Sequence, residues 1–123
     1  MREFIVDVMG SAYCVRCGLP SEISIGEYNA GECKIYSKVI LIDLDKRDCT
    51  FAEMMIKLGE VCAHEMLHAF LNEAGIDFDN CNEEGMCYFY MKNYLRLHEA
   101  VTYTIEAVRK EYELMALKSE EVK

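Results

Sequence analysis

The segment His64–His68 reads His-Glu-Met-Leu-His, and its spacing constrains the fold more than any other feature of the chain. Residues four apart lie on the same face of an α-helix, so both imidazoles can reach one metal ion. Glu65 can then hold the water molecule that the ion activates. Outside the motif, every position from Val61 to Phe70 is uncharged, which predicts a helix buried around its ligands. We therefore expect the two histidines to bind one Zn²⁺ ion, with Glu65 as the catalytic base.

A capping box predicts where this helix begins. Glu53 follows Thr50 by three residues, a pattern in which the two side chains satisfy the first free amides of a helix. Gly75 is a natural terminator, because glycine tolerates the left-handed conformation at a helix end. The sequence therefore predicts a helix over about 51–73, within the segment 50–74, with the histidines in its second half.

A second helix is predicted after a short connection. Asn80 as cap and Glu83 repeat the capping pattern, and apolar residues then recur at steps of mostly three and four. This predicts one long helix over the segment 80–118, or two helices joined near His98. The apolar stripe beyond Leu97 exceeds what so small a body can cover, so it either folds back on the sheet or makes a homodimer contact. The protein is accordingly expected to be a monomer or a homodimer through its C-terminal helix.

Residues 1–49 are predicted to form a small sheet. Short β-branched or apolar runs indicate strands at Phe4–Val8, Ile23–Ile25 and Lys34–Leu44, the last as one strand or a hairpin. The stretch from Gly10 to Pro20 is expected to be a loop. The predicted class is α+β: a short antiparallel or mixed sheet of about three strands, packed on the histidine-bearing helix and followed by the long helix. We expect a single domain over 1–123.

A catalytic zinc ion takes three protein ligands and keeps one position open, so a third ligand should come from a separate element. Glu83 and Glu84 open the second helix, and the short connection lets that helix fold back beside the histidines. Both acids also suit a helix N-terminus electrostatically, whatever else they do. The sequence leaves either glutamate open as the third ligand.

Composition excludes several classes of partner. The net charge is −9, whereas binding to nucleic acid or to an anionic membrane needs clustered Lys and Arg. No apolar run approaches the roughly 18 residues of a membrane span, and the acidic N-terminus does not resemble a signal peptide. Seven cysteines without a secretion signal indicate free thiols in the cytoplasm. We expect a cytoplasmic protein that acts on a protein or peptide.

The run from His64 to Gly75, followed by Asn82-Glu83-Glu84, resembles the minimal gluzincins. These are small phage- and mobile-element-borne zinc metallopeptidases of the ImmA/IrrE type. The resemblance covers about residues 34–97. It implies a zincin-like fold, in which a leader sheet lies against the HExxH helix and the next helix supplies a glutamate ligand.

For the site, the resemblance implies one zinc ion held by His64, His68 and Glu83, with Glu65 as base and Glu84 as the alternative third ligand. In the family, the position four residues after the glutamate ligand usually carries a carboxylate or amide that orients the first histidine. Here that position is Cys87, which departs from the pattern.

These observations together predict a zinc metalloendopeptidase. Its substrate is expected to bind along the sheet edge formed by residues 34–44. A tetrahedral oxyanion needs a donor besides zinc, and Tyr88, Tyr90 and His98 are the candidates by residue type.

Two other functions compete with this prediction. The first is a catalytically silent, zinc-stabilised module that binds a peptide or protein, which the substitution at Cys87 favours and an intact Glu65 disfavours. The second is a deformylase-like hydrolase with a cysteine ligand from an upstream strand, for which Cys33 is only a distant match.

Cys14 and Cys17 form a CxxC pair that resembles half of a zinc knuckle. A complete structural site needs four ligands, and Cys33 or the pair Cys81 and Cys87 could supply the others. The alternative is that these cysteines, like Cys62 in the histidine-bearing helix, are thiols that pack as small hydrophobic side chains.

Overall fold

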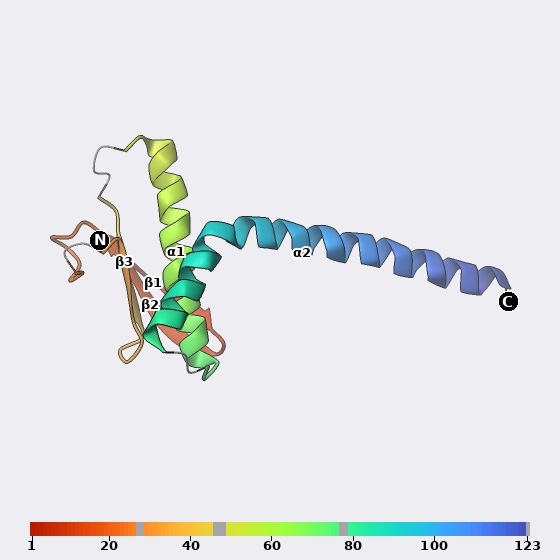
Figure 1. The fold of residues 1–123 in the computed structure, drawn as a ribbon, viewed down its shortest axis with the longest axis horizontal. Helices are drawn as coiled ribbons and strands as arrows, with labels where there is room; N and C mark the ends of the chain where they lie inside the picture. The colour runs from red at the N-terminus through yellow and green to blue at the C-terminus, as the bar shows by residue number, and fades with distance from the viewer. Residues whose placement is uncertain (27–28, 46–48, 77–78, 123) are drawn as a thin grey trace. The chain divides into compact units, whose positions relative to one another are not determined.

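The computed structural model describes residues 1–26, 29–45, 49–76 and 79–122 (Figure 1). By its internal contacts the chain divides into two units, residues 1–92 and residues 93–123, which are described separately. The first unit holds a sheet and two helical segments, and the described residues of the second unit, 93–122, are part of a helix. The prediction of a single domain stays a prediction.

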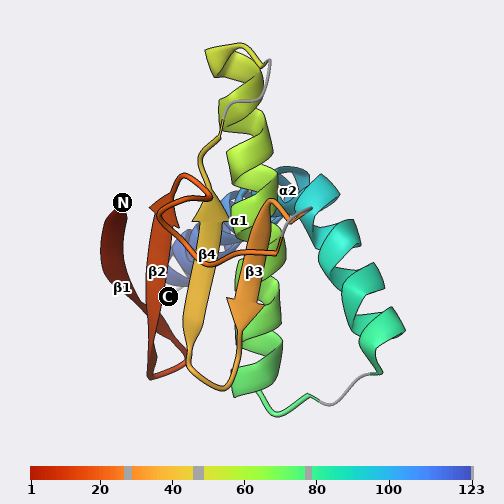
Figure 2. The ribbon, with the colours of Figure 1, turned by 90° about the vertical axis from the view of Figure 1, so that its left-hand side faces the viewer.

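The sheet has four strands rather than the three predicted. They are β1 (Arg2–Val8), β2 (Ser11–Gly18), β3 (Gly31–Lys34) and β4 (Val39–Asp43), in the order β1-β2-β4-β3 (Figure 2). The outer pairs are antiparallel and the central pair β2-β4 is parallel, so the sheet is mixed. The α+β class is confirmed.

The additional strand, β2, occupies the stretch that was predicted to be a loop. Met9 and Gly10 have φ angles of 53° and 91°, and Val8 pairs directly with Ser11. Positive φ at both central residues of a two-residue connection matches the right-handed twist of a β-hairpin. The loop prediction was wrong because Met-Gly was not recognised as a hairpin turn, and because the alternation of buried Tyr13 and Val15 with exposed neighbours was overlooked.

The segment Lys34–Leu44 forms part of a hairpin, one of the two predicted forms. β3 ends at Lys34, a turn follows, and β4 begins at Val39. The predicted strand at Ile23–Ile25 is absent from the sheet. Ile23 is buried instead through a turn, in which its backbone N–H donates to the carbonyl oxygen of Leu19 at 3.2 Å.

The helix α1 (Phe51–Glu73) confirms the prediction for the histidine-bearing segment. The hydroxyl of Thr50 accepts a hydrogen bond from the backbone N–H of Glu53 at 3.2 Å, as expected of an N-cap. Gly75 follows the helix with a φ of 69°. Cys62, expected to pack as a small hydrophobic side chain, is instead exposed.

One face of the sheet packs against α1, as Figure 2 shows for β3 and β4. Side chains from the strands and one alanine of α1 form the core: Val8, Tyr13, Val15, Ile40, Ile42 and Ala69. Complete burial of a Val or Ile side chain stabilises a fold by about 1.5–3 kcal/mol. This layer therefore fixes the rotation of α1 about its axis, and with it the direction of the two histidines.

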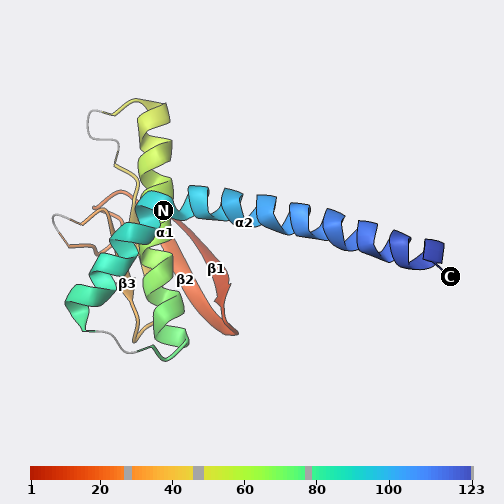
Figure 3. The same ribbon diagram turned by 45° about the vertical axis from the view of Figure 1, so that its right-hand side comes forward.

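The helix α2 (Asn80–Val122) is one continuous element. Its cap was predicted at Asn80, but Asp79 caps it, because the Asp79 side chain accepts from the backbone N–H of Asn82 at 2.9 Å. Within the first unit, the start of α2 runs antiparallel to α1 (Figure 3). Contacts pair the two segments in opposite chain order: Glu60 with Lys92, His64 with Tyr88, and His68 with Glu83.

The second unit is the part of α2 from Asn93 onward. Its large apolar side chains are exposed: Leu95, Leu97, Val101, Tyr103, Ile105, Val108, Tyr112, Leu114, Met115 and Leu117. The two predicted ways of covering this stripe, on the sheet or in a homodimer, stay predictions. Among the described residues, no helix is both long enough and apolar enough to cross a bilayer.

Candidate metal centre

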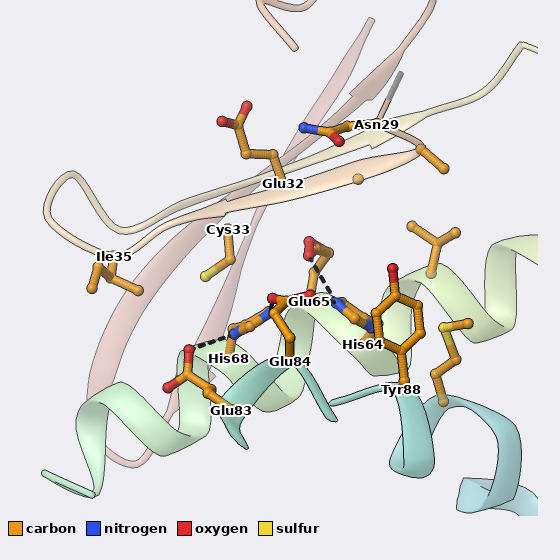
Figure 4. Close-up of a pocket in the computed structure, with 14 residues that line it drawn as sticks. Asn29, Glu32, Cys33, Ile35, His64, Glu65, His68, Glu83, Glu84 and Tyr88 are labelled. Atoms are coloured by element: carbon orange, nitrogen blue, oxygen red, sulfur yellow. Dashed lines mark hydrogen bonds and ion pairs between the residues drawn. The ribbon is translucent and has the colours of Figure 1, made fainter. Parts of the chain in front are cut away.

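The two histidines of α1 lie on one face of the helix, as their spacing predicts. Their ring centroids are 5.0 Å apart, and each side chain is only 12% exposed. Figure 4 shows the rings beside each other, between α1 and the start of α2. Residues 61–70 thus form a largely buried helix around the motif, except that Cys62 and Phe70 are exposed.

Glu84 of α2 contacts both imidazoles through its carboxylate. Its Oε1 lies 2.5 Å from Nε2 of His68, and its Oε2 lies 3.4 Å from Nε2 of His64. These are the ring nitrogens farthest from the α1 backbone. Three potential metal-binding groups, contributed by two helices, therefore meet at one point.

Glu83 contacts the other nitrogen of the same ring. Its Oε2 lies 2.7 Å from Nδ1 of His68, marked by a dashed line in Figure 4. A carboxylate at the second ring nitrogen fixes the orientation and tautomer of a histidine. The two glutamates thus occupy different positions around His68: Glu84 at Nε2 and Glu83 at Nδ1.

Cys87 lies beside the same two histidines, one helical turn after the glutamates. It is completely buried, and its Sγ and one ring nitrogen from each of His64 and His68 all lie within 4.8 Å of one another. The described residues therefore contain a group of side chains able to bind a metal ion. From the sequence, Cys87 was expected to depart from the family pattern and to be a possible ligand only of a second site with Cys14 and Cys17, not of the histidine site. Its spacing of three residues from Glu84, which puts both on one helix face, was the available signal.

Glu65 is the buried acid of the site. It is 6% exposed, its Oε1 lies 3.9 Å from Nε2 of His64, and its Oε2 has no hydrogen-bond partner among the described residues. Burial raises the pKa of this carboxyl to about 7, an effect that His68 opposes and that Glu84 and Glu32 reinforce. The site thus holds a carboxyl group whose second oxygen is available to a proton or a ligand.

His64 also carries an unpaired atom. Its Nδ1 is buried and has no hydrogen-bond partner in the described part of the chain. Burial lowers the pKa of His64, and the nearby Glu84 carboxylate opposes this effect. The neutral form that a metal ligand requires is therefore favoured.

Strand β3 closes the other side of the site. A pocket of about 510 Å³ lies between β3 and the helices, lined by Asn29, Ala30, Gly31, Glu32, Cys33, Ile35, Val61, His64, Glu65, His68, Glu83, Glu84, Tyr88 and Met91. A Cβ atom on Gly31 would lie 2.6 Å from Cγ1 of Val61 and 2.9 Å from Cγ of Glu65. Glycine at this position therefore allows β3 to approach the catalytic candidate closely.

Of the three candidate oxyanion donors, Tyr88 lies in the pocket. Its ring packs edge-to-face on His64 with centroids 4.8 Å apart, and Figure 4 shows its hydroxyl on the side of β3. Tyr90 lines a different hollow, together with Leu67 and Phe89. His98 belongs to the second unit.

The cysteine pair Cys14 and Cys17 lies on β2, where residues three apart face opposite sides of the sheet. The two thiols therefore do not face one ion together, and the described residues contain no second cluster of metal-binding side chains. The zinc-knuckle alternative depended on the prediction that this stretch is a loop. Cys33 lines the pocket from β3, and the side chain of Cys81 lies outside the described residues.

No protein-family model, no curated protein and no solved structure matches this chain.

Proposed function

We propose that the protein is a zinc-dependent metallopeptidase. The proposal depends on one observation, the buried Glu65 carboxyl with an unpaired oxygen beside two histidines and a carboxylate that converge from separate helices. This combination agrees with the resemblance to the minimal gluzincins.

The residues present fit a zinc ion. Two imidazoles and a carboxylate are a ligand set that catalytic zinc sites use. A buried polar atom without a partner costs about 1–3 kcal/mol, so the unpaired Glu65 Oε2 needs a compensating partner in the working protein. A polar ligand in the pocket would supply that partner.

We assign His64, His68 and Glu84 as ligands and Glu83 as the residue that orients His68. The contacts of the two glutamates support this order, because Glu84 reaches both Nε2 atoms whereas Glu83 reaches only Nδ1 of His68. The family resemblance favours the opposite assignment, in which Glu83 is the metal ligand and Glu84 the alternative.

When bound, zinc lowers the pKa of a water molecule and polarises a carbonyl group. Glu65 accepts the proton of the attacking water at its unpaired Oε2 and later delivers it to the leaving nitrogen. Tyr88 stands beside His64 and donates to the developing negative charge on the carbonyl oxygen.

A peptide is the substrate class that the pocket fits best. β3 is an edge strand with β4 on one side only, and residues 29–33 of this edge line the pocket. An extended peptide can add to such an edge through backbone hydrogen bonds. The scissile bond would then lie over Glu65.

The second candidate function is a catalytically silent, zinc-stabilised module that binds a peptide or protein in the same pocket. A buried Cys87 in place of an orienting acid favours it. The two candidates share the metal site and differ in whether Glu65 transfers a proton. Cleavage of a peptide library by the wild type but not by Glu65→Gln would support the enzyme, and equal binding without cleavage by either would support the module.

Metal analysis tests the shared site. Protein purified without chelators or an affinity-tag nickel column should contain one zinc ion per chain, and His64→Ala should lose it. Cys62→Ala, a change at an exposed position of the same helix, should keep it. A chain without stoichiometric zinc, or a His64→Ala variant with unchanged zinc, would contradict both functions.

A further inference from the structure

Two side chains of α2, Glu84 and Cys87, compete for the position next to the histidines. The carboxylate contacts both Nε2 atoms, and the thiol forms a cluster of potential ligand atoms with the same two histidines. The two differ in exposure, because the Glu84 side chain is 47% exposed whereas Cys87 is completely buried. Glu84 can therefore swing into solvent, and Cys87 has no such alternative position.

We propose that Cys87 is a permanent metal ligand together with His64 and His68, and that Glu84 is an exchangeable fourth ligand. This inference rests on the metal site of the proposed function. A zinc site with four protein ligands is closed, whereas catalysis needs one open position. Departure of Glu84 opens the site, and its return closes it.

Ligand chemistry supports a thiolate here. As the metal–sulfur bond forms, the S–H bond of Cys87 breaks and its proton passes to solvent, with no change of oxidation state. Thiolate and imidazole ligands together favour zinc and similar metals over magnesium or calcium, which prefer oxygen. The thiolate also supplies the negative charge near the ion after the carboxylate leaves.

Cobalt(II) substitution of the full chain tests the proposal by spectroscopy rather than by activity. A thiolate bound to cobalt gives a charge-transfer absorption in the near ultraviolet that imidazole and carboxylate ligands do not give. The wild type should show this band, and Glu84→Gln should retain it. Cys87→Ser should lose it and should bind cobalt at least about tenfold more weakly.

Two matched cysteine variants serve as controls. Cys33→Ser removes a thiol that lines the pocket, and Cys62→Ser removes an exposed thiol of α1. Both should keep the band. If the band survives in Cys87→Ser or disappears in Cys33→Ser, the ligand assignment is overturned.

The outcomes separate this inference from the proposed function. Wild-type protein that takes up no cobalt through His64 and His68 contradicts both. Histidine-dependent uptake without a thiolate band in the wild type leaves the proposed site intact and overturns the role of Cys87. Because that second result needs no variant, the proposal remains testable even if Cys87→Ser fails to fold.

Discussion

Glu65 and Glu73 are two glutamates of the same helix whose surroundings differ. The Glu73 carboxylate accepts hydrogen bonds from the hydroxyls of Ser11 and Tyr13, at 2.8 and 2.9 Å, and pairs with Lys38 at 3.3 Å. These hydrogen bonds, above all, hold the pKa of Glu73 below its ordinary value. The Glu65 carboxyl is buried with one oxygen unpaired, and its pKa is raised to about 7.

The difference distinguishes an acid whose carboxylate is hydrogen-bonded within the fold from the acid that we propose to be reactive. Glu73 joins the end of α1 to β2 and to the turn before β4, and its charge is fully used in holding them together. Among the described residues, the second oxygen of Glu65 has no hydrogen-bond partner, so that oxygen is available to a ligand or a proton. Unsatisfied buried groups with perturbed pKa values are a feature of functional sites.

The largest expected effect is on hydrolysis by the zinc-loaded protein. Glu65→Gln should lower the rate roughly 10²–10⁴-fold, because an amide cannot accept the proton. Glu73→Gln, the matched change eight residues later, should leave the rate nearly unchanged. Cleavage of a peptide library followed by mass spectrometry measures both. Equal losses of hydrolysis rate in the two variants would show that Glu65 has no role in hydrolysis that Glu73 lacks.

The pH dependence of stability should have opposite signs for the two acids in metal-free protein. Between its ordinary pKa of 4.5 and its folded value of about 7, Glu65 stays protonated when folded and ionises when unfolded. Stability is therefore lost as pH rises through this window, by up to about 3 kcal/mol. For Glu73 the stabilisation is present above pH 4.5 and is lost as pH falls through its lowered folded pKa.

Urea denaturation of the wild type and the two glutamine variants across pH isolates each acid, because His64 and the other titrating groups are common to all. Relative to the wild type, Glu65→Gln should gain stability as pH rises from 4.5 to about 7, and the difference should level off at higher pH. The deficit of Glu73→Gln should shrink toward zero as the solution becomes acidic. A Glu65→Gln difference that does not change with pH would contradict the raised pKa.

Gly31→Ala tests the surroundings of Glu65, the first of the two acids compared. The added methyl group would meet Val61 and Glu65 at 2.6 and 2.9 Å, so we expect a loss of about 1–3 kcal/mol in stability and a displaced carboxyl group. Gly85→Ala is the control, because a Cβ there meets nothing within 4 Å. In a helix that change should stabilise by about 0.5–1 kcal/mol. Thermal unfolding measures both, and a harmless Gly31→Ala would contradict the close approach of β3.

The smallest expected effect comes from removing one of the hydrogen bonds to Glu73. Tyr13→Phe removes a buried hydroxyl that donates to Glu73 and accepts from Asn72 at 3.2 Å. The loss should be about 1–2 kcal/mol in the free energy of unfolding, because two partners lose a hydrogen bond. Zinc content should not change. A loss of zinc would show that the two ends of α1 are coupled.

Local sequence patterns were sufficient to predict the helices but not to predict the sheet. The capping residues Thr50 and Glu53 and the glycine at 75 placed α1, because caps and periodicity act within a few residues. The strand β2 was missed, since its turn at Met9 and Gly10 is an uncommon hairpin sequence. Its parallel partner, β4, lies more than twenty residues later in the chain, and no local sequence pattern predicts such a pairing.

The sequence by itself determined that His64, Glu65 and His68 share one helical turn, since the geometry of an α-helix is the same wherever it occurs. Only the tertiary structure decided which groups meet them. The rotation of α1 on the sheet and the antiparallel course of α2 bring Glu84 and Cys87 to the histidines. These contacts depend on packing between distant segments, which a linear pattern does not record.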